Sequence, residues 1–141
     1  PSKKMSKSSP IQNSYIALND PADVIRRKIR RAVTDSGSEV VADPDKPALA
    51  NLIGIYAVLT DSTPEEVQAA FAGKGYGDFK AALGDVVVSA VEPIQERLAE
   101  YEADPDRVET ILREGTEKAR AYANVTLARV RDRIGIGGYR E

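Results

Sequence analysis

Two lysines and two serines near the start of the chain have the types and the spacing to bind a polyphosphate. They stand in the run Lys4, Met5, Ser6, Lys7 and Ser8. The small hydroxyl side chains beside the lysines leave room for a ligand. Phosphate oxygens accept hydrogen bonds from ammonium, hydroxyl and backbone donors. If pyrophosphate is the leaving group of a reaction, the two lysines would stabilise the negative charge that grows on it.

The surroundings of this run predict an exposed loop. Residues 1–10 are polar and rich in serine, and Pro1 and Pro10 stand at the two ends. Such a loop could close when a nucleotide binds and open again for product release. The alternative interpretation is a disordered basic tail, because five residues are a short motif.

Composition indicates an ordinary globular protein. The chain has 141 residues, of which 42% are hydrophobic and 30% are charged, which suits one domain with a proper core. It has no cysteine and no histidine, so disulfides, thiolate zinc sites, cysteine nucleophiles and histidine bases are excluded, and we predict no metal site. No apolar run approaches the roughly 18 residues of a membrane helix, and no signal peptide is visible. We therefore expect a soluble, cytoplasmic protein without membrane partners.

Charge is distributed unevenly along the chain. Residues 1–35 carry eight basic side chains against three acidic ones, a local charge of +5, whereas the net charge of the whole chain is -2. A basic first part on an acidic body suggests contact with polyphosphate or nucleic acid near the front.

The first predicted helix carries most of this positive charge. Asp20 is the expected N-cap and Pro21 the expected first helical residue, and apolar residues recur at helical spacing as far as Val33. The other faces of this helix carry Arg26, Arg27, Lys28, Arg30 and Arg31. These cations either form a solvated face that also complements the helix C-terminus, or contact RNA phosphates.

The rest of the chain predicts further helices and no strand. Helical periodicity covers residues 47–59, a capping box at residues 63–66 begins a short helix, and long apolar stripes run through 78–102 and 105–134. Asp104 is the expected N-cap of the last helix, with Pro105 at its first position. Residues 73–77 are glycine-rich like a nucleotide-binding loop, but no strand precedes them, so we interpret them as a tight turn. The predicted fold class is all-α, an antiparallel helical bundle.

Three arginines occupy the final turns of the last predicted helix. They are Arg129, Arg131 and Arg133. Cations at a helix C-terminus complement the helix dipole without any further role. Contact with an RNA backbone is the functional alternative.

The order of these features resembles the class I aminoacyl-tRNA synthetases. Residues 4–8 spell the KMSKS signature of that class, and a basic helix and an all-helical body follow. The details resemble the tryptophanyl-tRNA synthetases, with matching segments at Lys28–Ser36, Asn51–Ile53 with Tyr56, Gly73–Lys80 with Leu83, Pro93-Ile94, and Leu112–Gly115 with Lys118–Arg120. The resemblance covers nearly the whole chain. Tyrosyl-tRNA synthetases fit less well after the KMSKS loop.

The resemblance implies an activity and roles for the loop residues. The full enzyme would use ATP with Mg²⁺ to activate tryptophan, and would then transfer the acyl group to the tRNA for tryptophan. Lys4 and Lys7 would hold the ATP phosphates as the catalytic residues. Ser6 and Ser8 would support the phosphates by hydrogen bonds, and Met5 would pack near the adenine.

The resemblance also implies how the chain is organised. Residues 1–18 would be the KMSKS loop and the end of an α/β nucleotide-binding catalytic domain, 19–36 a basic connecting helix, and 37–141 the helical anticodon-binding domain. We expect a part of a longer protein, since four residues precede the only methionine, Met5. We also expect this longer protein to be a homodimer. Without the N-terminal catalytic domain these 141 residues should be inactive.

Two other functions stay open at this stage. One is a helical protein-interaction module, and the other is a generic nucleic-acid-binding module, each with an incidental basic tail. Replacement of Lys7 by Ala in the parent protein would cause a large loss of tryptophan activation in a synthetase and would leave an interaction module unaffected. Loss of affinity spread over residues 26–31, with strong salt dependence, would indicate the nucleic-acid binder.

Overall fold

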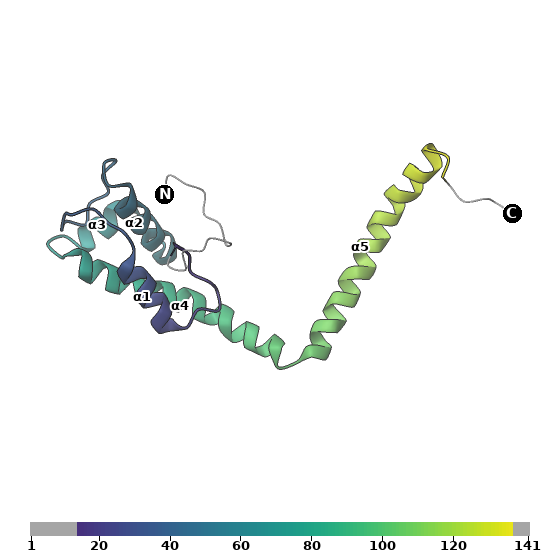
Figure 1. The fold of residues 1–141 in the computed structure, drawn as a ribbon, viewed down its shortest axis with the longest axis horizontal. Helices are drawn as coiled ribbons and strands as arrows, with labels where there is room; N and C mark the ends of the chain where they lie inside the picture. The colour runs from purple at the N-terminus through teal and green to yellow at the C-terminus, as the bar shows by residue number, and fades with distance from the viewer. Residues whose placement is uncertain (1–13, 137–141) are drawn as a thin grey trace. The chain divides into compact units, whose positions relative to one another are not determined.

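The fold is all helical, as the sequence predicts. The computed structural model describes residues 14–136, which contain five α-helices and no strand (Figure 1). The helices are α1 (Ala22–Arg31), α2 (Pro47–Thr60), α3 (Pro64–Ala70), α4 (Tyr76–Glu102) and α5 (Pro105–Arg133). None of these described helices has the length and apolar character to cross a membrane.

The chain divides into two compact units. The first ends at Glu96 and the second begins at Arg97, a boundary that lies inside α4. The first unit contains α1 to α3 and most of α4. The second contains the last turns of α4 and the whole of α5.

Three helices begin where local sequence signals place them. Pro47 is the first residue of α2. The capping box before α3 forms in both directions, because Glu66 N donates to Thr63 Oγ1 at 3.2 Å and Thr63 N donates to Glu66 Oε2 at 2.8 Å. Before α5, the side chain of Asp104 accepts a hydrogen bond from Arg107 N at 3.0 Å. These predictions are confirmed.

The predicted N-cap of α1 is wrong. Pro21 occupies the N-cap position without a side-chain hydrogen bond, and the helix begins at Ala22. The Asp20 carboxylate instead accepts hydrogen bonds from Ala17 N at 2.8 Å and from Lys28 Nζ at 2.5 Å. An aspartate before a helix can bond either the helix amides or the preceding turn. Lys28, the seventh residue of the helix, favours the second arrangement.

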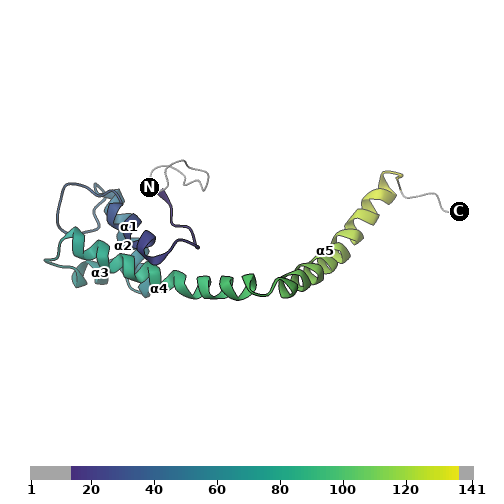
Figure 2. The same cartoon turned by 60° about the horizontal axis from the view of Figure 1, so that its bottom comes forward.

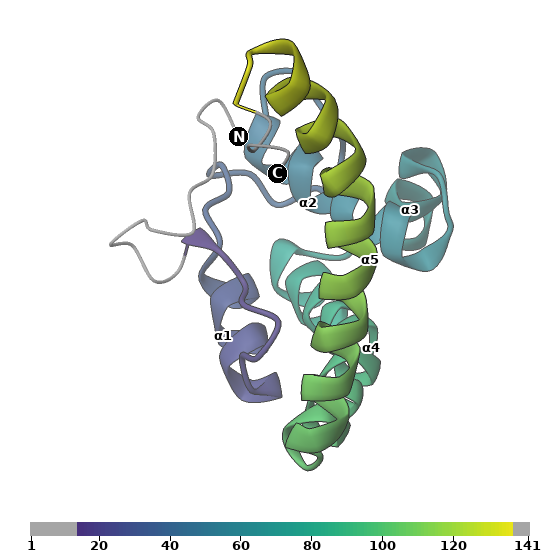
Figure 3. The same ribbon diagram turned by 90° about the vertical axis from the view of Figure 1, so that its right-hand side faces the viewer.

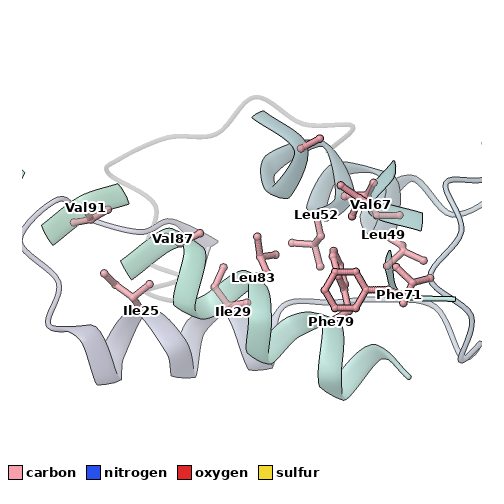
Figure 4. Packing of buried hydrophobic residues seen from close by; sticks show 13 residues of the cluster. Ile25, Ile29, Leu49, Leu52, Val67, Phe71, Phe79, Leu83, Val87 and Val91 are labelled. Atoms are coloured by element: carbon pink, nitrogen blue, oxygen red, sulfur yellow. The ribbon is translucent and has the colours of Figure 1, made fainter. Parts of the chain in front are cut away.

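One hydrophobic core holds the first unit together. Its buried residues are Ile25, Ile29, Val40, Leu49, Leu52, Ile53, Ala57, Val67, Phe71, Phe79, Leu83, Val87 and Val91, most of which are labelled in Figure 4. At its centre the rings of Phe71 and Phe79 meet edge to face with centroids 5.1 Å apart, and Tyr56 lies 5.5 Å from Phe71. Such aromatic pairs add to the stabilisation that burial alone supplies.

The basic helix lies directly against the longest helix of this unit. Figures 1 and 2 both draw α1 alongside α4. At the contact Gly84 is buried, and a Cβ built on it would lie 3.4 Å from Arg26 Cγ and 3.5 Å from Arg26 Cα. A Cβ would therefore make ordinary contacts with Arg26, so the spacing of α1 and α4 at Gly84 admits a methyl group but no larger side chain.

The apolar residues of α5, in the second unit, are exposed to solvent. The helix α5 forms as predicted (Figure 3), but none of its residues is buried. Tyr122 is 88% exposed, Leu112 65% and Val125 54%. The bundle core predicted from sequence is therefore made by α1 to α4 and takes no residue from α5.

Candidate functional site

The predicted phosphate-binding residues lie outside the described part of the chain. These residues are Lys4, Met5, Ser6, Lys7 and Ser8, and the description begins at residue 14. The structure therefore shows how the segment that follows the KMSKS loop is held.

A tight turn at residues 17–20 connects this segment to α1. Asp20 N donates to Ala17 O at 3.0 Å, and Ala17 N donates to Asp20 Oδ2 at 2.8 Å. From α4, the side-chain amide of Gln95 donates to two carbonyls of the turn, Leu18 O and Asp20 O, each at 2.8 Å. The turn is thereby closed by its own bonds and attached to a helix distant in sequence.

Lys28 completes the attachment from α1. Its Nζ donates to Asp20 Oδ2 and lies 5.0 Å from the centre of the Tyr15 ring. The Lys28 side chain is only 10% exposed. Partial burial by itself would raise the pKa of Asp20, but the hydrogen bonds from Lys28 and Ala17 outweigh it and hold that pKa below its ordinary value. The lysine charge is thus already matched within the fold.

The other cations of α1 are exposed. Arg26 Nε lies 2.7 Å from Asp85 Oδ1, and Arg27 Nη1 lies 3.5 Å from Asp23 Oδ2. Exposed pairs of this kind are weak and exchange readily with another anion. Two further arginines of this helix, Arg30 and Arg31, are exposed and make no ion pair within residues 14–136.

A polar cluster fixes the connection that leaves α1. Tyr76, the first residue of α4, donates its hydroxyl to Asp35 with oxygen separations of 2.8 and 3.0 Å. Gly37 N donates to Asp35 Oδ1 at 2.7 Å, and Lys46 Nζ lies 3.8 Å from the same oxygen. Desolvation opposes ionisation of Asp35, but these donors lower its pKa. Desolvation and the bond to Asp35 raise the pKa of Tyr76.

A lysine of α4 binds the chain just after the end of α1. Lys80 Nζ donates to Ala32 O at 2.7 Å and to Thr34 Oγ1 at 3.1 Å. A cation at this position also complements the negative end of the helix dipole. Partial burial lowers the pKa of Lys80. Together with the Asp35 cluster, this contact ties the C-terminal end of α1 to α4.

A groove of about 470 Å³ opens beside α3. Residues 38–41 line one side, and Gln68 with residues 71–75 line the other. The lining combines apolar side chains with the charges of Glu39 and Lys74, and Lys74 Nζ lies 5.1 Å from the centre of the Phe71 ring.

The arginines of the second unit are free for a partner. Arg129, Arg131 and Arg133 are exposed, and none makes an ion pair in the described part of the chain.

Within residues 14–136, no group of three or more acidic side chains is placed to hold a metal ion.

Comparison with known protein families shows to which family this chain belongs. Residues 1–92 match the family of tRNA synthetases class I (W and Y). The chain belongs to this family. The match includes the KMSKS loop, the turn at residues 17–20, all of α1 to α3 and more than half of α4.

Similar members of this synthetase family are tryptophan–tRNA ligases. Those of Enterococcus faecalis and Bacillus subtilis are 46% and 44% identical to the chain over 138 residues, which is 97% of this chain. A crystal structure of tryptophanyl-tRNA synthetase from Mycoplasma pneumoniae superposes with a TM-score of 0.79 at 33% identity and covers 94% of the chain. The chain spans about two fifths of the length of these relatives, 41% or 42%.

Three residues whose hydrogen bonds organise the first unit were not predicted from the sequence. They are Gln95, Asp35 and Tyr76. For Gln95 a signal was present, because it continues the face of Val87 and Val91 at four-residue spacing, and both valines are buried. A polar amide on a core-facing position is expected to have a hydrogen-bonding partner.

Proposed function

We propose that this chain is the C-terminal part of a tryptophan–tRNA ligase. The observation that carries the proposal is the match of 97% of the chain to tryptophan–tRNA ligases at 44% to 46% identity. The KMSKS loop would serve the catalytic domain of the full-length protein. The helical part would bind the tRNA. ATP would enter as its Mg²⁺ complex, so that the metal comes with the substrate.

The first reaction is activation of tryptophan. A carboxylate oxygen of tryptophan attacks the α-phosphorus of ATP, the bond from this phosphorus to the bridging oxygen breaks, and pyrophosphate leaves with the electron pair. Lys4 and Lys7 hold the β- and γ-phosphates and stabilise the charge that develops on the leaving group. Ser6 and Ser8 donate hydrogen bonds to the same phosphates, and Met5 packs near the adenine.

The second reaction transfers the amino acid to tRNA. A ribose hydroxyl at the end of the tRNA attacks the carbonyl carbon of tryptophanyl-adenylate, and AMP leaves while the hydroxyl proton is released. In this step the helical part holds the tRNA so that the acceptor end reaches the catalytic domain.

Exposed cations support binding of the tRNA by the helical part. Arg30 and Arg31 make no ion pair within residues 14–136, and Arg26 and Arg27 hold only exposed ones. These side chains, with the arginines of α5, would contact phosphates. The groove beside Lys74 offers room for one unstacked base. Proteins usually recognise the bases of single-stranded loops by stacking on them and by hydrogen bonds to their edges. The anticodon loop is the single-stranded RNA that we propose for it.

The full-length protein would work as a cytoplasmic homodimer, where tRNA and ATP are available. Tryptophan-dependent exchange of labelled pyrophosphate into ATP tests the proposal directly. The full-length protein should show exchange with tryptophan and none with tyrosine. Residues 1–141 alone should show none, because they span only about two fifths of the length of the tryptophan–tRNA ligases that they match. Exchange that depends on tyrosine, or no exchange by the full-length protein, would refute the proposed function.

A further inference from the structure

We propose that an apolar stripe along α5 is the surface by which the helical part packs against the remainder of the full-length polypeptide. The stripe consists of Leu112, Ala119, Ala123, Leu127, Val130 and the C-cap residue Ile134. The inference rests on the proposed function, because that function makes this chain a part of a longer one. It goes beyond that function by giving α5 a partner.

The six residues of the stripe lie on one face of the helix. They follow one another at spacings of seven, four, four, three and four residues. Since successive residues of an α-helix are turned by about 100°, all six fall within about 80° of one another around the axis. The stripe is therefore continuous from the first turns of α5 to its end.

The stripe has no cover within residues 14–136. No residue of α5 is buried, and Ile134 is 60% exposed and Val130 46%. Helices in proteins owe most of their stability to the packing of an apolar face, and a contiguous exposed patch marks an interaction site. Beside the stripe, Lys118, Tyr122 and Val125 help to line a groove of about 620 Å³. Side chains of a partner could insert there.

The length of the related proteins identifies the partner that we propose. Tryptophan–tRNA ligases match 97% of this chain, so the match includes α5, yet the chain spans only 41% or 42% of their length. About three fifths of such a protein therefore lies outside residues 1–141. A surface on the same polypeptide is present at a high effective concentration, which favours it over a second copy of the chain.

The chemistry of the stripe argues against RNA as its partner. Interfaces with nucleic acid are polar and positively charged, whereas the side chains of Leu112, Leu127 and Val130 offer no hydrogen-bond donor. Arg129 and Arg131 are each one residue from Val130 and so lie about 100° from it around the helix. Packing of the stripe against protein therefore leaves these arginines available for the phosphates of tRNA.

Photo-crosslinking in the full-length protein identifies what covers the stripe. The variant Leu112→p-benzoylphenylalanine places a photoreactive ring on the stripe. The matched control is Thr110→p-benzoylphenylalanine, because Thr110 is exposed and lies about 200° round the same turn. We expect Leu112 to crosslink to residues that precede Pro1 in the same polypeptide, and Thr110 to give no such product. Mixed isotope-labelled and unlabelled copies distinguish crosslinks within one polypeptide from those between two.

Four crosslinking results would overturn the proposal. They are a product between two copies, a product with added tRNA, a product confined to residues 1–141, and a yield from Leu112 no higher than that from Thr110.

A pair of charge substitutions tests the same packing without a crosslinker. Val130→Asp would place an unpaired charge in the apolar contact, whereas Ala128→Asp would place it on the opposite face of the helix. In the full-length protein, the first should speed hydrogen exchange of the α5 amides by about tenfold or more, and the second should leave it near the parent rate. Equal rates in the two variants would overturn the proposal.

A parallel assay keeps the packing separate from the proposed function. Tryptophan-dependent exchange of pyrophosphate into ATP by the unaltered full-length protein reports on the function alone. Its absence, together with the expected Leu112 crosslink, would refute the function and support the packing. Its presence, together with any of the four contrary crosslinks, would refute the packing and support the function.

Discussion

The hydroxyl of Tyr76 donates to the carboxylate of Asp35, which lies 41 residues earlier, with oxygen separations of 2.8 and 3.0 Å. This contact joins the start of α4 to the connection that follows α1. Gly37 belongs to the same cluster, because a Cβ there would lie 2.6 Å from Asp35 Oδ1 and 3.0 Å from the Tyr76 hydroxyl. The cluster therefore sets where α1 ends relative to the core.

Tyr76→Phe removes the hydroxyl from this cluster and leaves the ring in place. We expect a lower urea midpoint for residues 1–141, since Asp35 loses the hydrogen bonds from the Tyr76 hydroxyl, and a pKa of Asp35 closer to the ordinary value. Urea unfolding and NMR titration of the Asp35 carboxyl measure the two effects. The matched control is Tyr122→Phe, because Tyr122 is 88% exposed. Equal midpoints for the Tyr76 variant and the unaltered chain would contradict a stabilising role for the contact.

Acid should lower the free energy of unfolding of the chain through protonation of Asp20. Its folded-state pKa is lowered, so its contribution to the free energy of unfolding is present above the unfolded pKa of about 3.9. That contribution is lost as the pH falls through the lower, folded-state value. The variant Asp20→Asn lacks the contribution at every pH. Urea unfolding between pH 7 and pH 2 should show its deficit shrinking below about pH 4, whereas a constant deficit would contradict the assigned pairing.

Substitutions at Gly84 should separate helix propensity from packing. A Cβ at this position would make ordinary contacts of 3.4 to 3.8 Å with Arg26. Gly84→Ala should therefore stabilise the chain by about 1 kcal/mol through helix propensity. Gly84→Leu should destabilise it by about 1–3 kcal/mol, because the larger side chain forces α1 away from α4. Urea unfolding measures both, and a destabilised alanine variant would show that the contact is tighter than described.

Helix existence and several helix starts could be predicted because the signals are local. The pair Thr63 and Glu66 satisfies two backbone groups within four residues, and Asp104 caps its own helix. Apolar spacing likewise identified Leu83 and Val87 as core residues. Such features depend on near neighbours along the chain, which a single sequence displays.

The features that were not predicted correctly involve residues whose partners are distant in sequence, or residues for which two sets of partners compete. Asp20 was assigned to the α1 cap, but Lys28 and Ala17 N offer it better hydrogen bonds. The spacing of Gln95 from Val87 and Val91 indicates that its amide needs a hydrogen-bonding partner, but it does not identify the carbonyls, which lie 75 and 77 residues away. On α5 the apolar spacing predicted the helix correctly, but periodicity does not say whether a stripe is covered.

Arginines of α1 should contribute to tRNA binding through charge alone. Arg30→Ala and Arg31→Ala should each weaken binding by the full-length protein and lower the salt slope of the association constant by about one. The effect should be similar for any tRNA sequence, because phosphate contacts position the RNA without reading it. The matched control is Arg97→Ala, an exposed arginine of α4 outside the proposed set. Filter binding at several salt concentrations measures the slopes, and slopes unchanged from the parent would exclude these two side chains from the interface.

The measurement that tests the account most directly is the rate of ATP–pyrophosphate exchange by the Lys7→Ala variant of the full-length protein. If Lys7 stabilises the departing pyrophosphate, kcat should fall about a hundredfold or more, with a much smaller change in the affinity for ATP. Lys3→Ala, in the same segment but outside the proposed lysine pair, serves as the control and should retain activity. A Lys7→Ala variant with the kcat of the parent would contradict the central claim.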